Sequence, residues 1–156
     1  MINKTAFAGA ALAAAFLTGC YSWQRRGDGL SDTPYYADLG PAWIDVSRYP
    51  PEQQRNYKTF VAVCGRCHTL ARAINSPTES RLYWRFHLAR MNLHSRLSEG
   101  APLSRKDVAD ILDFLDYDGR VRKIEDRKSF EILTEDLKKR FDPILQKQLS
   151  RLRTGE

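Results

Sequence analysis

The sequence has few cysteines: Cys20, Cys64 and Cys67 are the three in 156 residues. A structural zinc site takes four ligands, and the second cysteine pair that would supply them is absent. The apolar run Ala6–Leu17 is shorter than the roughly 20 residues that a membrane-spanning helix needs. The sequence also contains no internal repeat and no low-complexity tract. These absences argue against a zinc protein, a spanning helix and a repeat architecture.

Two of the cysteines belong to one motif, Cys64-Gly65-Arg66-Cys67-His68. Residues three apart on a helical turn lie on the same face, so both thiols can reach the two vinyl groups of one porphyrin. The next residue, His68, then places its imidazole under the iron as the proximal ligand. The motif therefore predicts one haem c, bonded covalently through Cys64 and Cys67 and ligated by His68.

The N-terminus predicts export. A basic start with Lys4, the apolar run and the small residues before Cys20 form the pattern of a secretory signal. Leu17-Thr18-Gly19-Cys20 also resembles the bacterial lipobox, which implies cleavage before Cys20 and lipid attachment to it. An ordinary signal peptide with a coincidental cysteine is the alternative. With a lipobox, one thiol carries lipid and two form thioethers, so none is left for a disulfide.

The charge balance bears on partners. Lysine and arginine number 25 against 19 acidic residues, a formal net charge of +6, which favours acidic proteins or anionic headgroups. Because the basic residues are scattered and an exported lipoprotein does not meet a genome, nucleic acid is not an expected partner. Tyr21 follows the predicted lipidated cysteine. By resemblance to bacterial lipoprotein sorting, the lack of Asp there favours the outer membrane over the inner one, facing the periplasm.

The chain divides into four predicted segments. Residues 1–19 form the signal peptide, and residues 20–50 form a flexible lipidated tether with many proline and glycine turn signals. Residues 51–118 form an all-α haem domain, and residues 119–156 form a helical C-terminal extension. We expect Trp43 of the tether to pack on the domain.

Apolar stripes at helical spacing predict three helices in the haem domain, at residues 51–64, 80–97 and 104–118. The first runs directly into the motif, and the third starts with a capping box and ends at Asp118-Gly119. So small a domain buries little core alone, so folding is expected to depend on the haem.

The C-terminal extension is more polar. A helix is predicted from Asp126 to Arg140, and Asp142-Pro143 is the pattern of a new helix start. The two helices are expected to form an amphipathic hairpin that packs on the haem domain, or to provide a docking element for a partner protein.

These features together resemble a monohaem c-type cytochrome of the class I type with a lipoprotein signal. The matching residues are Cys64, Cys67 and His68, between an amphipathic helix and a terminal amphipathic helix, over roughly residues 51–118. The resemblance implies a small cytochrome c-like helical domain around the haem, and electron transfer by iron cycling between two oxidation states. It implies an electron carrier with redox protein partners, not an enzyme with a small-molecule substrate.

Met91 is the favoured sixth ligand of the iron. In Trp84–Met91, a tryptophan followed by Arg-Met is similar to a pattern of periplasmic cytochrome domains whose methionine binds the iron. His87 and His94 lie one turn to either side and are alternatives, as is an open position that would suggest gas binding or catalysis. Methionine raises the reduction potential, whereas a second histidine makes a lower-potential carrier.

Other side chains near this helix are candidates to hold the haem propionates, because guanidinium groups suit carboxylate geometry. They are Arg72, Arg85 and Arg90, with Tyr83 and Trp84. In the class I pattern, a carbonyl in the loop after the motif orients the proximal imidazole, and residues 74–77 are the analogue here.

Two further interpretations remain open. Thr59–Cys64 would be a buried strand before a Cys-x-x-Cys pair in a thioredoxin-like thiol-disulfide oxidoreductase, but no strand is predicted after His68. Alternatively, the haem is purely structural and the chain is an assembly subunit of a larger redox complex, a role that the long C-terminal extension allows.

Overall fold

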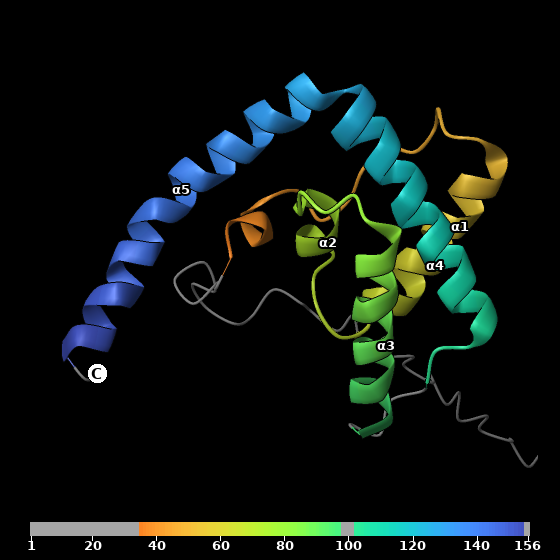
Figure 1. The fold of residues 1–156 in the computed structure, drawn as a ribbon, viewed down its shortest axis with the longest axis horizontal. Helices are drawn as coiled ribbons and strands as arrows, with labels where there is room; N and C mark the ends of the chain where they lie inside the picture. The colour runs from red at the N-terminus through yellow and green to blue at the C-terminus, as the bar shows by residue number, and fades with distance from the viewer. Residues whose placement is uncertain (1–34, 98–101, 155–156) are drawn as a thin grey trace, which may run out of the picture.

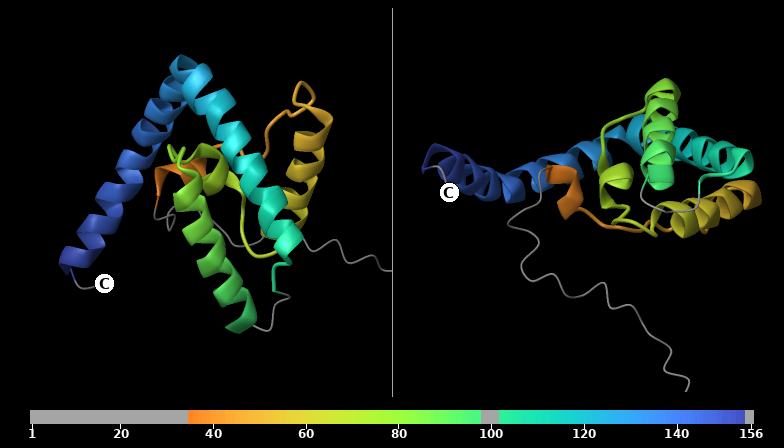
Figure 2. Two further views of the ribbon diagram at one scale, coloured as in Figure 1. Left: turned by 45° about the vertical axis from the view of Figure 1, so that its right-hand side comes forward. Right: turned by 90° about the horizontal axis from the view of Figure 1, so that it is seen from below.

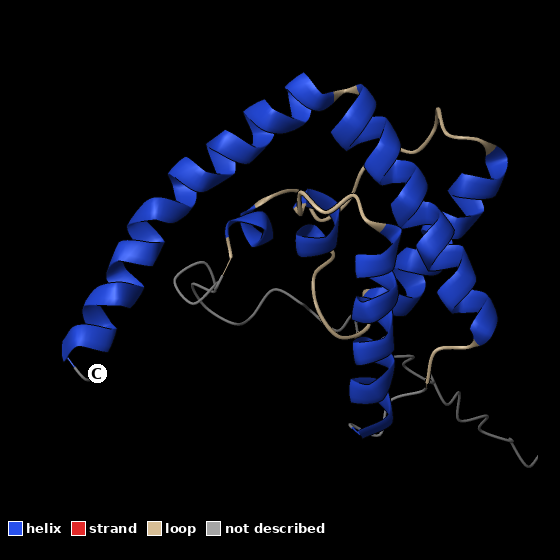
Figure 3. Cartoon of the chain, in the orientation of Figure 1, coloured by secondary structure: helices blue, strands red, loops and turns tan. Residues whose placement is uncertain are grey.

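A computed structural model describes residues 35–97 and 102–154 (Figure 1). Its elements, in chain order, are η1 (Tyr36–Leu39), α1 (Pro51–Cys64), α2 (Ala71–Asn75), α3 (Arg81–Leu97), α4 (Arg105–Asp118), η2 (Gly119–Glu125) and α5 (Arg127–Thr154). No strand occurs among the described residues, which confirms the all-α class (Figure 3). The predicted signal peptide, Cys20 and the start of the predicted tether lie outside them.

The three helices predicted for the haem domain are confirmed as α1, α3 and α4. Pro51 occupies the first position of α1, where a missing N–H leaves no helical bond unmade. Ser104 and Asp107 form the predicted capping box, in which each side chain accepts a hydrogen bond from the backbone N–H of the other. The short helix α2 was not predicted.

The core lies between α1, α3 and α4 (Figures 1 and 2). Phe60 of α1 stacks on Phe114 of α4 with the ring centroids 5.2 Å apart. The buried members of this core cluster are Phe60, Leu70, Ile74, Trp84, Leu88, Ile111, Leu112, Phe114 and Leu115. Leu70 and Ile74, which follow the motif closely in the chain, belong to this cluster. The packing of the core therefore fixes where the motif lies.

The helix predicted to end at Asp118-Gly119 continues instead. Gly119 has helical backbone angles, φ −57° and ψ −46°, and the π-helix η2 leads into α5. Buried Asp118 accepts hydrogen bonds from Nε and Nη2 of Arg122, at 2.7 and 2.6 Å, one turn further on. This ion pair links α4 to η2 and explains why the local turn signal does not end the helix.

The predicted C-terminal hairpin is also wrong, because α5 is one helix with Pro143 inside it. A proline in a helix removes one backbone hydrogen bond, but it does not stop the helix here. Phe130 and Leu137 in the first half are buried, and this half contacts η1 and η2. No described residue after Leu137 is buried, and that half extends away from the body (Figure 1).

Residues 35–50 pack on the helices, unlike the flexible tether that was expected. Ala37 of η1 is buried, and its carbonyl accepts a hydrogen bond from Asn75 Nδ2 at 3.2 Å. Trp43 contradicts the prediction, since its side chain is 70% exposed. Its neighbour Ile44 contacts the core instead, so the backbone directs Trp43 to solvent.

Candidate functional site

The Cys-x-x-Cys-His motif lies at the C-terminal end of α1 and in the turn that follows. Cys64 is the last residue of α1, and Gly65 caps it by donating its N–H to the Val61 carbonyl at 3.1 Å. Cys64 is half-buried against the core cluster, whereas Cys67 and His68 are exposed. Neither thiol is in a disulfide. The motif thus presents two free thiols and an imidazole beside an apolar core.

The imidazole of His68 has a defined hydrogen-bond partner. Its Nδ1 lies 2.8 Å from the carbonyl oxygen of Thr69. Because a carbonyl only accepts, Nδ1 carries the proton and Nε2 keeps the lone pair that a metal needs. The predicted acceptor in residues 74–77 is therefore wrong. The Ile74 carbonyl of that loop accepts from Arg122 Nη2 at 2.8 Å instead.

Helix α3 presents the predicted distal residues on its inward side. At about 100° per residue, Trp84, His87 and Met91 share one face. Trp84 is buried in the cluster that Cys64 contacts, while His87 and Met91 are half-buried outside that cluster. His94 is exposed. The structure therefore brings Cys64 and Trp84 to one core, with Met91 two turns further along α3.

Trp84 has an unpaired polar atom. The residue is 6% exposed, and its Nε1 has no hydrogen-bond partner among the described residues. A buried N–H without an acceptor is unfavourable by about 1–3 kcal/mol. A carboxylate placed against Trp84 would accept this hydrogen bond. This atom is thus an available donor for a carboxylate such as a haem propionate, which is compatible with the fit of the group.

Two of the predicted arginines lie near His87. Burial, together with the positive charges of Arg90 and Arg72, lowers the pKa of His87. Arg72 donates from Nε to Asp38 at 2.8 Å, so its charge is already paired. Arg90 is exposed and forms no ion pair in the part of the chain that the structure describes. Arg90 is therefore the arginine best placed for an added carboxylate, whereas Arg85 lies further round α3, away from His87.

The Cys64 thiol does not suit disulfide exchange. Burial raises the pKa of the Cys64 thiol to about 12, whereas exchange needs a thiolate and hence a lowered pKa. The segment Thr59–Cys64 is helical, and the described residues hold no sheet of a thioredoxin-like fold. Within residues 35–97 and 102–154, no three His, Cys, Asp or Glu side chains gather as ligands of a bare metal ion.

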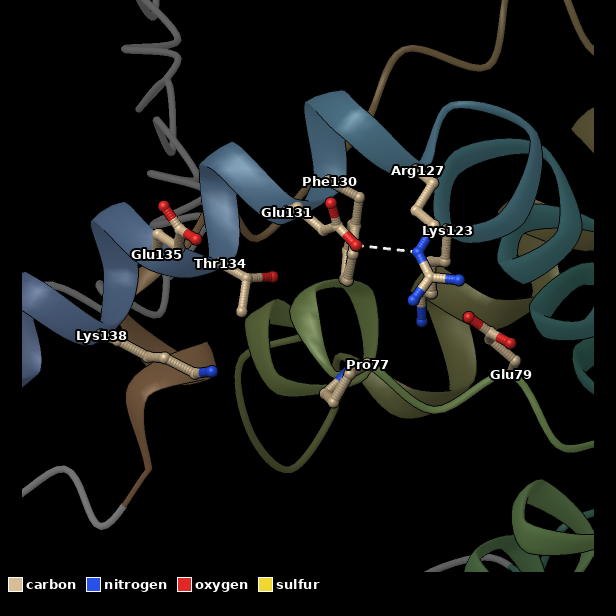
Figure 4. A pocket seen from close by; sticks show the side chains of 9 residues that line it. All are labelled: Pro77, Glu79, Lys123, Arg127, Phe130, Glu131, Thr134, Glu135 and Lys138. Atoms are coloured by element: carbon tan, nitrogen blue, oxygen red, sulfur yellow. Dashed lines mark hydrogen bonds and ion pairs between the residues drawn. The ribbon is translucent and has the colours of Figure 1, made fainter.

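A separate groove of about 320 Å³ lies between α5 and the segment before α3 (Figure 4). Both positive and negative side chains line it, and Arg127 Nε pairs with Glu131 at 2.8 Å. The lining residues are Pro77, Glu79, Lys123, Arg127, Phe130, Glu131, Thr134, Glu135 and Lys138. Because the three cationic and three anionic side chains balance, the groove favours no ligand of one sign.

Comparisons with protein-family models, curated proteins and solved structures found no match. Among the described residues, no helix has the length and apolar content to cross a membrane. The structure itself defines an all-α protein whose first long helix ends in a Cys-x-x-Cys-His turn.

Proposed function

We propose that this chain is a lipid-anchored monohaem c-type cytochrome that transfers electrons in the periplasm, as a carrier or as a subunit of a larger redox complex. The motif at the end of α1 carries the proposal. Cys64 is held against the core, and Cys67 and His68 are exposed one turn further on. This arrangement suits a group bonded at two sulfurs and ligated by the next imidazole.

Each proposed contact is made by a residue described above. Cys64 and Cys67 form the thioethers, and His68 binds the iron through Nε2 while the Thr69 carbonyl holds its ring. Met91 is the proposed sixth ligand, with His87 and His94 as alternatives. The propionates accept hydrogen bonds from Trp84 Nε1 and Arg90. When bound, the haem supplies one-electron chemistry.

The surroundings of the motif favour electron transfer over disulfide chemistry. Because its pKa is about 12, the Cys64 thiol stays protonated at neutral pH and does not act as a nucleophile. The apolar core cluster against which Cys64 packs limits the access of water, which is one of the factors that set a reduction potential. Lipid on Cys20 keeps the domain at the membrane, where acidic redox proteins are the expected partners.

The test is the intact mass and visible absorption of the full chain, made in cells with haem-ligation machinery. The wild type is expected to carry the mass of one haem and of lipid. Cys67→Ala, at an exposed position, is expected to lose stable covalent attachment, and Cys20→Ala to lose the lipid but keep the haem. A wild type with the bare polypeptide mass would overturn the proposal.

A purely structural haem is distinguished by redox titration of the same preparation. An electron carrier changes its absorption reversibly with potential. A haem that does not titrate, in a protein that co-purifies with a larger redox complex, would favour the assembly role instead.

A further inference from the structure

Helix α3 has an unusual composition for a helix on the outside of a domain. Its 17 residues include Arg81, Arg85, Arg90 and Arg96 but no Asp or Glu. Most surface helices mix both signs of charge, which keeps their local potential low. The charged side chains of α3 itself are therefore all positive, although Arg81 in its first turn is paired with Asp113 of α4.

The outer side of α3 is apolar. Leu82, Phe86, Leu93 and Leu97 are between 57% and 74% exposed. At about 100° per residue they lie within about 60° of one another, opposite the buried face of the helix. They lie in a row roughly 22 Å long along the helix. We call these four residues the outer stripe.

The outer stripe lies on a helix that stands out from the neighbouring helices. Viewed from below, α3 projects from the layer formed by α1, α4 and α5 (Figure 2, right). Trp84 and Leu88 bury the opposite side of α3 in the core. The outer stripe is therefore on a different face from the proposed haem site, and it can meet a flat surface without a clash from the neighbouring helices.

Arginines flank the stripe on both sides. Helical geometry places Arg85 and Arg96 along one edge and Arg90 along the other. All three are exposed, and within the described ranges no ion pair involves them. Arg81, in contrast, is bound to Asp113 at 2.6 Å. Arg90 is already proposed above as the partner of a haem propionate, so Arg85 and Arg96 are the two guanidinium groups beside the stripe that are left for an external anion.

We infer that the outer stripe and its flanking arginines bind the surface of an anionic phospholipid bilayer. Leucine and phenylalanine side chains enter the boundary between headgroups and acyl chains, and Arg85 and Arg96 along one edge pair with lipid phosphates. A bilayer accepts apolar side chains along the whole stripe, whereas an acidic protein patch matches only the charge. The inference goes beyond the proposed function, since it requires neither haem nor redox chemistry.

This contact would orient the domain. A single acyl anchor at the end of a chain segment leaves a domain free to rotate, whereas a second contact along a helix fixes one face against the membrane. The motif and Met91 lie away from the outer stripe, so they remain accessible to a soluble redox partner.

The test measures co-sedimentation with vesicles of the mature chain, residues 20–156, in which Cys20→Ala removes the site of lipid attachment. The vesicles contain phosphatidylcholine alone or mixed with phosphatidylglycerol. We expect strong binding only to the mixed vesicles, weakened at least 30-fold by the double variant Arg85→Glu/Arg96→Glu, since loss of each arginine costs about 1 kcal/mol and each glutamate adds repulsion. Phe86→Gln/Leu93→Gln is expected to weaken binding at least tenfold.

Matched controls lie on α5. Ile132 is 61% exposed and Lys128 is exposed, so Ile132→Gln and Lys128→Glu change the same kinds of surface elsewhere. Their vesicle affinity is expected to stay within twofold of that of the parent, and circular dichroism checks that every variant is helical. Equal affinity for both vesicle types, no binding by the parent, or equal effects of the α3 and α5 variants would overturn the inference.

A protein occupant gives a different result. If the α3 variants slow electron transfer to a soluble partner but leave vesicle binding unchanged, the stripe binds protein and the inference is wrong. Haem content is measured separately by absorption, so loss of vesicle binding and loss of haem are distinguished.

Discussion

The ammonium nitrogen of Lys123 lies 5.7 Å from the centre of the Trp84 ring. Lys123 is 3% exposed, and its Nζ donates to the Thr78 carbonyl at 3.1 Å. The Phe130 ring is on another side of it, at 5.6 Å. Burial lowers the pKa of Lys123 to about 8, despite the opposing attraction of Asp118. A cation is thus held among aromatic rings next to the proposed haem pocket.

This lysine predicts a pH dependence of stability. Its pKa is 10.5 in an ordinary environment and about 8 in the folded chain. Between these values the unfolded chain binds more protons, so the free energy of unfolding rises as the pH increases from about 8. Lys123→Met keeps the apolar contacts and is expected to abolish the rise. Urea unfolding at about pH 7.5 and 9.5 measures it. An unchanged rise in the variant would contradict this assignment.

Substitution of Asp118 is expected to cause a large loss of stability. Asp118 is 1% exposed, binds Arg122 through two hydrogen bonds and accepts from the Tyr49 hydroxyl at 2.9 Å. Asp118→Leu leaves the Arg122 guanidinium without its carboxylate and is expected to destabilise the fold by about 3–5 kcal/mol. Tyr49→Phe removes one hydrogen bond and is expected to cost about 1 kcal/mol. Denaturant unfolding compares them, and equal losses would show that the Asp118–Arg122 pair contributes nothing.

Gly65 in the motif and Gly119 after α4 are expected to respond differently to substitution by alanine. A Cβ on Gly65 would lie 2.6 Å from the Val61 carbonyl oxygen, whereas a Cβ on Gly119 meets nothing closer than 3.8 Å. Gly65→Ala must therefore shift the end of α1, which holds Cys64. We expect a destabilisation of about 1–3 kcal/mol and less covalent haem. Gly119→Ala, at helical backbone angles, is expected to be neutral or stabilising by up to about 1 kcal/mol. Unfolding and haem absorption test both, and similar behaviour of the two variants would contradict the prediction.

The sixth ligand predicts a spectroscopic difference. If Met91 binds the iron, the oxidised protein shows a sulfur-to-iron charge-transfer band in the near infrared. Met91→Ala is expected to lose the band and to lower the reduction potential. His87→Ala and His94→Ala are expected to keep it. A wild type without the band would end the assignment of Met91.

Local signals in the sequence predicted the helix boundaries well where they act alone. The fit of Pro51 to the first position of a helix and the hydrogen bonds of the Ser104 capping box involve only residues within one turn of the chain. For this reason α1 and α4 begin where expected. Asp118-Gly119 and Pro143 are also local signals, but the helix continues through both. At Asp118, the reason is the ion pair with Arg122, which depends on the continued helix itself.

The candidate site likewise combines features that local sequence signals reveal with features that depend on tertiary packing. The spacing of Cys64, Cys67 and His68 can be recognised from the sequence alone. The Thr69 acceptor and the burial of Lys123 depend on how the turn after α1 and the π-helix η2 pack. The outer stripe did leave a signal in the sequence, because α3 has apolar residues on two opposite faces and only one of them can meet the core.

Pro143 has a practical consequence. Without an N–H at this position, the carbonyl one turn earlier lacks its helical partner, and the rest of α5 buries no side chain in the described chain. A fluorophore or an electrode linker attached within this outlying arm would leave the packed helices untouched. The arm is therefore a suitable handle for measuring single-molecule orientation or current.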